Sequence, residues 1–219
     1  MFVLTIDQAG SRSSQDRIPE LLDLLLPVRT VLPWERSVGD EAQGVVAGAG
    51  DVVDAVLLCL RAGGWYVGIG IGDVERPYPS SPREGRGSAF VAARKAVDRA
   101  KKTGDRAPLA VEGPDGRADL AAEAEGVLAL LGRHVLARSD AEWRILDLLE
   151  FGERGTQPSA ARTLGISPQA VSKAAARAAW HEEHAVRPAA ARLLAWADVA
   201  TEPPAARDGR AASYGGAVL

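Results

Sequence analysis

The sequence predicts an α+β protein, in which a front part built around a β-sheet is followed by an all-helical part. Strand-like apolar runs alternate with helical periodicity over residues 1–112, whereas helical periodicity alone continues after about residue 119. A length of 219 residues suits one or two domains, and we expect two. We place a connecting helix at 113–138, a second domain at 139–200 and a flexible tail at 201–219, where small residues, proline and glycine leave little to bury.

The front part reads in the order strand, helix, strand, strand, helix, strand, helix, strand. The pair Gly39-Asp40 suits the bend of a hairpin between two short strands. From Gly68 to Gly72, glycine alternates with isoleucine in a strand that another backbone or a ligand can approach closely. We therefore expect one antiparallel or mixed sheet with helices on one face. The expected strands cover 2–6, the hairpin around 38–46, 65–71 and 109–111, and the expected helices cover 18–26, 51–60 and 88–102.

The charge and the cysteine content limit the possible functions of the protein and its cellular compartment. The net charge of −3 does not favour nucleic acid, but the stretch from Arg154 to Arg177 also carries Arg162 and Lys173 and no acid. The single cysteine, Cys59, lies in an apolar run, so we expect a buried and inert thiol. No run approaches the ~20 apolar residues of a membrane span, and the first residues lack the basic flank of a signal peptide. We expect a cytoplasmic protein with no membrane partner.

Residues from about Ser139 to Trp180 have the pattern of three helices joined by short turns. Ser139 can cap the first helix, and Phe151-Gly152 marks its end. Thr156 can cap the second helix, whose buried face is formed by alanine and leucine.

The segment between the second and third helices is the most specific part of this pattern. Gly165 takes the tight-turn conformation, and Ile166 is expected to fill the angle between the helices. Ser167 caps the third helix, and Pro168 occupies its first turn. Val171 faces inward, so the segment predicts a helix-turn-helix unit.

The remaining residues near the start of the third helix are expected to point outward, where a helix-turn-helix enters the major groove of DNA. We assign Gln169 and Lys173 to base edges, since glutamine can read adenine and lysine can bind guanine. We assign Arg162 and Arg177 to the phosphate backbone, and Ser172 completes the outward face. The alternative is a plain helical hairpin with solvated charges.

Ala161, the residues 164–167 (Leu-Gly-Ile-Ser) and Val171 resemble the helix-turn-helix of MarR-type regulators and of the fourth region of bacterial sigma factors. The resemblance covers this unit alone and implies double-stranded DNA as the partner. We expect a homodimer, because two recognition helices supply the affinity that one weakly basic unit lacks.

Two carboxylates of the front part lie where acids of neighbouring strands can converge on a divalent cation: Asp7 at the end of the first strand and Asp40 at the hairpin tip. With the glycine-rich strand 67–72 and the helix that Gly87 opens, they resemble the catalytic domain of class III nucleotidyl cyclases and of GGDEF diguanylate cyclases. The resemblance implies a ferredoxin-like, cyclase-palm-like sandwich over 1–112, with Asp7 and Asp40 at the metal positions.

Three positions depart from the cyclase pattern and argue against catalysis. Val38 and Ala42 stand where the diguanylate motif has glycine and phenylalanine, and residues 90–91 (Phe-Val) stand where cyclases carry asparagine. Arg94 and Lys95 remain as phosphate partners. Three alternatives stay open for the front part: an active cyclase, a degenerate domain that senses a nucleotide or a metal, and a scaffold or dimerisation domain.

The chain as a whole resembles small bacterial proteins grouped as SatD-like, which are often labelled transcriptional regulators. We therefore expect a sequence-specific DNA-binding regulator that is not an enzyme and needs no cofactor, with a nucleotide as a candidate effector. The alternative is a cyclase-like sensor or enzyme that binds a nucleotide or a metal, with Mg²⁺ and a nucleotide as its ligands and an accessory helix-turn-helix.

Overall fold

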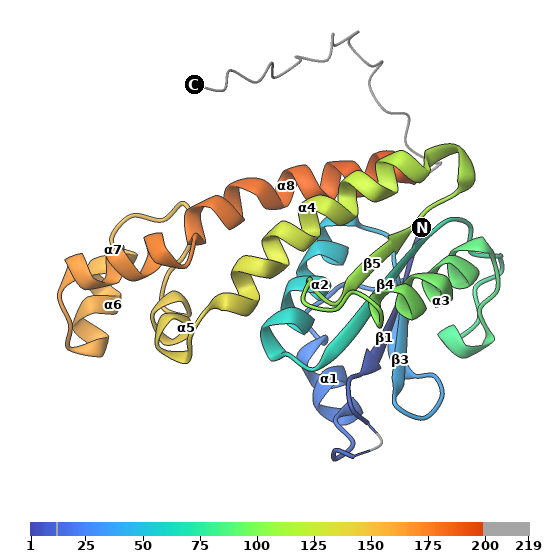
Figure 1. Cartoon of the computed structure of the whole chain (residues 1–219), viewed down its shortest axis with the longest axis horizontal. Helices are drawn as coiled ribbons and strands as arrows, with labels where there is room; N and C mark the ends of the chain where they lie inside the picture. The colour runs from blue at the N-terminus through green and yellow to red at the C-terminus, as the bar shows by residue number, and fades with distance from the viewer. Residues whose placement is uncertain (12, 199–219) are drawn as a thin grey trace, which may run out of the picture.

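The computed structural model describes residues 1–11 and 13–198. Figure 1 shows two parts: a β-sheet covered by helices, and a group of short helices at the opposite end of two long helices. The flexible tail predicted for 201–219 lies outside the described residues, as do the last two residues of the second domain predicted for 139–200. No helix within the described ranges combines the length and the apolar character that crossing a membrane requires.

The strands form one mixed sheet with the order β2-β3-β1-β4-β5. β1 runs antiparallel to both of its neighbours, β3 and β4, and β2 runs antiparallel to β3. Among the described strands, the pairing of β4 with β5 alone is parallel. The prediction of one antiparallel or mixed sheet is therefore confirmed. The strands are β1 (Phe2–Gln8), β2 (Leu32–Arg36), β3 (Glu41–Val46), β4 (Trp65–Ile71) and β5 (Leu109–Glu112).

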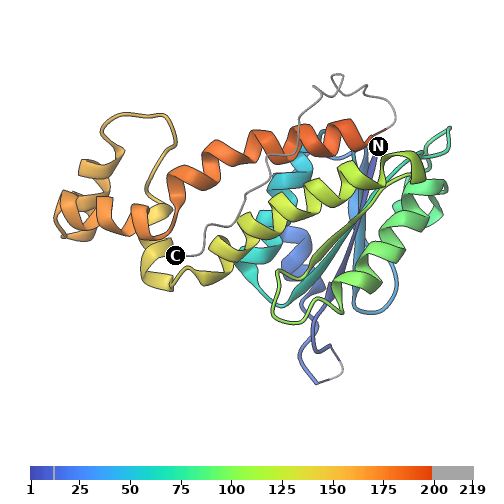
Figure 2. The same cartoon turned by 45° about the horizontal axis from the view of Figure 1, so that its top comes forward.

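Four helices lie on one face of the sheet, and the main hydrophobic core lies between them and the strands. Because side chains alternate along a strand, Phe2, Leu4 and Ile6 of β1 all point into this core. The two longest of these helices, α4 (Ala118–Ala137) and α8 (Trp180–Ala197), lie side by side, as Figures 1 and 2 show. The helices of this face are α1 (Ile18–Leu24), α2 (Ala49–Ala62), α4 (Ala118–Ala137) and α8 (Trp180–Ala197).

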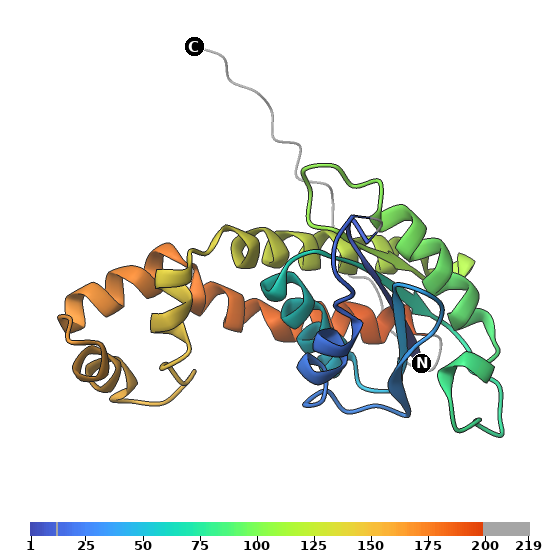
Figure 3. The ribbon, with the colours of Figure 1, turned by 90° about the horizontal axis from the view of Figure 1, so that it is seen from below.

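α3 (Ser88–Ala100) covers the opposite face, as the view from below in Figure 3 shows. Gly68 and Gly70 of β4 face this helix, and a Cβ atom at Gly70 would lie 2.2 Å from the carbonyl oxygen of Ala89. The close backbone approach predicted for this strand is confirmed, and the approaching backbone is a helix. The expectation of helices on one face only is wrong, because glycine leaves room for a helix on the second face.

Among the described residues that follow β5, the structure has helices joined by loops and no strand. After α4 come the short helices α5 (Asp140–Leu146), α6 (Thr156–Leu164) and α7 (Pro168–Arg177), and α8 then returns along α4. The C-terminal half of α8 packs on α4 and α2, and Leu194 belongs to the core of the sheet part.

Candidate nucleic-acid interface

α5 begins at the residue that the sequence predicts. Ser139 caps it: the N–H of Glu142 donates to Ser139 Oγ at 3.3 Å, and the carboxylate of Glu142 accepts from the N–H of Ser139 at 3.0 Å. This reciprocal pair satisfies two backbone donors that a helix start leaves open. The helix ends at Leu146, well before the predicted end at Phe151-Gly152.

α6 and α7 are joined by the turn Gly165-Ile166-Ser167, which has the predicted backbone. Gly165 is in the left-handed conformation, with φ of 65°. Ser167 Oγ accepts a hydrogen bond from the N–H of Ala170 at 3.2 Å, and Pro168 takes the first helical position. Three of the predicted turn features are therefore confirmed.

Two details of the predicted unit are wrong. Ile166 is 37 % exposed and does not fill the angle between the helices; instead its N–H donates to the carbonyl of Ala161 at 3.0 Å. The residue before α6 is Gly155 in a left-handed conformation, so Thr156 is the first helical residue and not the cap. Glycine adopts this conformation without strain, and the chain needs no side-chain cap to turn there.

A small hydrophobic core of its own holds the three helices α5, α6 and α7 together. Val171 is fully buried at its centre, as predicted. The facing residues of α6 and α7 are mostly alanines, which let the two helices approach closely. The buried members are Leu146, Leu149, Ala160, Ala161, Val171, Ala175, Ala178 and Trp180.

The predicted outward face of α7 is exposed. Gln169, Ser172 and Lys173 are all exposed, and no hydrogen bond or ion pair joins them to another side chain in the part of the chain that the structure describes. Gln169, Lys173 and Arg177 follow one another at intervals of four residues, so they form one line along the helix. Arg162 is exposed on the preceding helix, α6.

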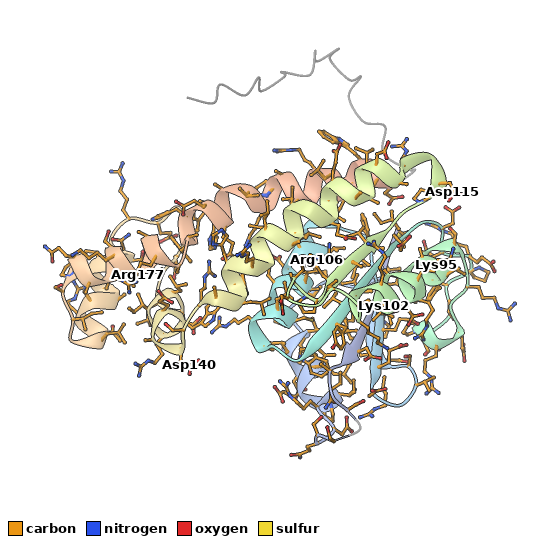
Figure 4. All side chains as sticks on the ribbon, viewed as in Figure 1. Lys95, Lys102, Arg106, Asp115, Asp140 and Arg177 are labelled. Carbon is orange, nitrogen blue, oxygen red and sulfur yellow. The ribbon has the colours of Figure 1, made fainter. Side chains whose placement is uncertain are left out.

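Arg177 differs from the other residues of this face because it has a partner. Its Nε lies 3.4 Å from Oε1 of Glu142 on α5, although its side chain remains 65 % exposed. The backbone N–H and hydroxyl of Ser139, together with the charge of Arg177, hold the pKa of Glu142 below its usual value. Lys173 is thus the less neutralised cation of α7. Figure 4 shows Arg177 at the end of the molecule opposite Lys95.

The joint between the sheet part and α5–α7 is built from buried charges that the sequence pattern does not reveal. Arg138, the residue before the cap of α5, donates to the carbonyl of Ala178 at 2.7 and 3.0 Å and pairs with Glu183 of α8. Arg187 pairs with the same carboxylate. The spacing of four residues between Glu183 and Arg187 was the only signal available for this cluster.

An aromatic contact fixes the loop between α5 and α6 to α8. The ring of Phe151 stacks on His184, with centroids 4.7 Å apart, and meets Trp180 edge-on at 5.6 Å. His184 Nδ1 lies 2.8 Å from the carbonyl of Trp180. Burial, with the nearby charge of Arg187, lowers the pKa of His184, so its imidazole is neutral at neutral pH.

The structure brings the two predicted metal residues to one open cavity of about 710 Å³, lined by Asp7, Asp40 and Lys101. The carboxylate of Asp7 is already engaged, because Lys101 Nζ donates to its Oδ2 at 2.6 Å. Burial raises the pKa of Asp7, and the nearby charges of Asp40 and Glu41 raise it further. The contact with Lys101 lowers this pKa but does not outweigh the other causes. No group of three His, Cys, Asp or Glu residues suited to a metal ion occurs among the described residues.

The two predicted phosphate partners do not join these carboxylates. Arg94 donates to both carboxylate oxygens of Glu41, which is a buried acid of β3. Lys95 lines a separate cavity of about 420 Å³. Lys101, which no sequence pattern linked to Asp7, is the cation that lies beside this carboxylate.

The fold and its surfaces define a two-part protein, in which a mixed sheet carries a small helical unit with an exposed polar and basic helix face. Comparison with known proteins identifies no relative: no family model, no curated protein and no solved structure matches the chain.

Proposed function

We propose that the protein binds double-stranded DNA through α7 and acts as a sequence-specific transcriptional regulator. The observation that carries this proposal is the line of exposed side chains on α7, of which Gln169 and Lys173 make no side-chain hydrogen bond or ion pair within the described residues. In a helix-turn-helix such residues lie in the major groove, and their amide and ammonium groups can read base edges.

The local structure of α5–α7 supports this role. The Ser167 cap and the left-handed Gly165 orient α7 across α6, and the small core fixes that arrangement. A rigid unit presents its contact side chains without a large entropic cost on binding. We propose on this basis that α5, α6 and α7 form a helix-turn-helix, as the resemblance to MarR-type regulators and to sigma factors implies.

The charge of the unit limits how tightly one copy can hold DNA. From Arg154 to Arg177 the chain carries four basic residues and no acid, but Arg177 is partly neutralised by Glu142. Phosphate contacts supply most of the affinity of DNA-binding proteins, so a unit with few free cations binds weakly alone. We therefore propose that the protein acts as a homodimer with two recognition helices.

The proposal is tested by fluorescence anisotropy with labelled duplex DNA in a salt series. Replacing Lys173 by alanine should weaken duplex binding, and the slope of log K against log salt should become shallower by about 1, because one cation is lost from the interface. The matched control is Lys102→Ala, since Lys102 is an exposed lysine just after α3, far from Arg177 of α7 in Figure 4. Equal loss in both variants, or no loss in Lys173→Ala, would overturn the assignment.

We also propose that the front part has a ferredoxin-like architecture. The strand order β2-β3-β1-β4 with antiparallel neighbours, and α1 and α2 on one face, support this view. α3 and β5 are then additions, which cover the second face and extend one edge. The likeness to cyclase domains and to SatD-like proteins is a proposal of the same kind.

A second candidate function is nucleotide sensing, which the shared cavity of Asp7 and Asp40 favours. The residues present do not fit a resident divalent metal, because Lys101 holds Asp7 and the described residues offer no group of three ligands. What fits better is an anionic ligand that the ammonium group of Lys101 can attract.

Nucleotide binding is tested by thermal shift and by turnover with ATP and GTP, each with and without Mg²⁺. Sensing predicts a rise in melting temperature that Lys101→Ala reduces and Lys102→Ala leaves unchanged. Turnover that Asp40→Asn abolishes would favour an enzyme instead. With neither stabilisation nor turnover, the front part is a scaffold.

A further inference from the structure

The outward face of α4 has a composition that its own chain does not explain. Glu123, Gly126, Leu130 and Arg133 follow one another at intervals of three or four residues, and all four are exposed. Leu130 is 65 % exposed, which is high for a leucine in the middle of a long helix. This face lies opposite the residues by which α4 packs into the main core.

Gly126 is the least expected of these residues. A glycine inside a helix costs about 1 kcal/mol relative to alanine. Gly132 on the same helix has an evident reason, because a Cβ there would lie 2.6 Å from the side chain of Leu60. At Gly126 a Cβ would meet nothing within 4 Å. Nothing within the described chain therefore needs a glycine at this position.

A groove of about 650 Å³ lies along the same face, between α4 and the segment that precedes β5. Gly126, Ala129 and Leu130 line it, and the exposed Leu136 continues it toward the end of α4. The lining combines apolar residues with three charged ones, Asp105, Arg106 and Arg133. An apolar surface with a charged rim is the usual anatomy of a protein interface.

The charges of this face are complementary to those of a second copy. Suppose that two α4 helices pack antiparallel about a two-fold axis at the level of Leu128. A residue of one helix then lies at the level of the partner residue that is equally far from position 128 in the opposite direction. Leu130 then lies over the partner's Gly126, and Arg133 lies opposite the partner's Glu123. Neither Glu123 nor Arg133 has an ion-pair partner within the described part of its own chain.

We propose that the protein forms a homodimer through the outward faces of α4, packed antiparallel, with Leu130 seated on Gly126 of the other copy. Two ion pairs between Glu123 and Arg133 flank this contact and set its register. The inference extends the proposed function, which calls for a dimer and on which it rests for its biological role. Its test uses no DNA, so failure of the dimer and failure of DNA binding can be told apart.

The dimer places the two α5–α7 units at opposite ends. From Leu128 to Arg138 the helix rises about 15 Å, so the C-terminal ends of the two α4 helices lie roughly 30 Å apart. The recognition helices lie farther out. Recognition helices of a dimer reach successive major grooves only at separations of about 34 Å or a multiple of it. The arrangement therefore predicts half-sites on one side of the duplex.

Sedimentation velocity of the full chain over a wide range of concentration tests the contact. The wild type should show a monomer–dimer equilibrium, since a single helix pair buries less surface than a standard interface. Leu130→Glu and Gly126→Leu should each weaken association about tenfold or more. Leu26→Glu is the matched control, because Leu26 is highly exposed after α1 and outside the face.

A charge exchange tests the register. Glu123→Arg and Arg133→Glu should each weaken the dimer, because each places like charges opposite one another, and the double variant should restore it. A chain that stays monomeric at all concentrations, or a dimer that Gly126→Leu leaves intact, would overturn the proposal. Failure of the double variant to restore association would overturn the antiparallel register. Circular dichroism of each variant confirms that the helices are retained.

Discussion

A guanidinium nitrogen of Arg138 lies 2.5 Å from the carboxylate of Glu183, and each of these side chains is only 2 % exposed. The pair joins the end of α4 to the first turn of α8, at the joint between the sheet part and α5–α7. Arg138 also donates to the carbonyl of Ala178, and Arg187 pairs with Glu183 from the other side. Buried charges are tolerated only when they are paired in this way.

Replacing Glu183 by glutamine should lower the free energy of unfolding by about 3 kcal/mol or more, because Arg138 is left as a buried cation without its counter-charge. Urea denaturation followed by circular dichroism measures the change. Glu182→Gln is the matched control, since its neighbour Glu182 is exposed and should change stability little. Equal stability of both variants would mean that the ion pair does not hold the joint.

The stability of the protein should fall in acid through Glu183. Burial alone would raise the pKa of this carboxyl, but the hydrogen bond and charge of Arg187 and the charge of Arg138 outweigh it and hold the pKa below the ordinary 4.5. A lowered pKa contributes stability that is fully present above pH 4.5 and is lost as the pH falls through the folded-state value.

Urea denaturation at a series of pH values should therefore show wild type and Glu183→Gln converging below pH 4.5. The pKa of His184 is also lowered, but from 6.5, so its contribution is lost in a higher pH range. A difference between the two proteins that stays constant from neutral pH to strong acid would contradict the role given to the Glu183 charge.

Gly70→Ala should separate α3 from the sheet. The new Cβ would lie 2.2 Å from the backbone of Ala89 and of Ala93, and backbone atoms cannot rotate away as a side chain can. We expect a loss of about 1–3 kcal/mol in the free energy of unfolding. Gly50→Ala in α2 is the control, because its Cβ meets open space and the helix gains propensity. Thermal or urea unfolding distinguishes the two.

Asp7→Asn should leave the protein as stable at neutral pH as the wild type, or more stable by less than about 1 kcal/mol. Burial raises the pKa of Asp7, and a raised pKa contributes stability below the ordinary 3.8 that is lost as the pH rises through the folded-state value. The charged carboxylate is therefore a net cost at pH 7. A strong loss of stability at pH 7 would show that the contact with Lys101 outweighs the burial.

Local signals in the sequence were sufficient to predict the turn between α6 and α7. Gly165, Ser167 and Pro168 act through backbone conformation and short-range hydrogen bonds, which depend on neighbouring residues only. The same holds for the Ser139 cap and for the limits of β4. The filling role given to Ile166 was wrong, because how a side chain packs depends on helix angles that local rules do not set.

Contacts between residues that are far apart in the chain could not be predicted from the sequence. Asp7 and Lys101 are separated by 94 positions, and Arg138 and Ala178 by 40, so no local pattern pairs them. The return of α8 along α4 is of the same kind. By itself the sequence determined the order of the strands and helices in the sheet part, the exposed line of α7 and a strand open to close approach. Tertiary packing decided that the helix α3 packs on the glycines of β4, that Lys101 pairs with Asp7, and that one face of α4 stays uncovered. Each of these depends on surfaces that only the folded chain brings together.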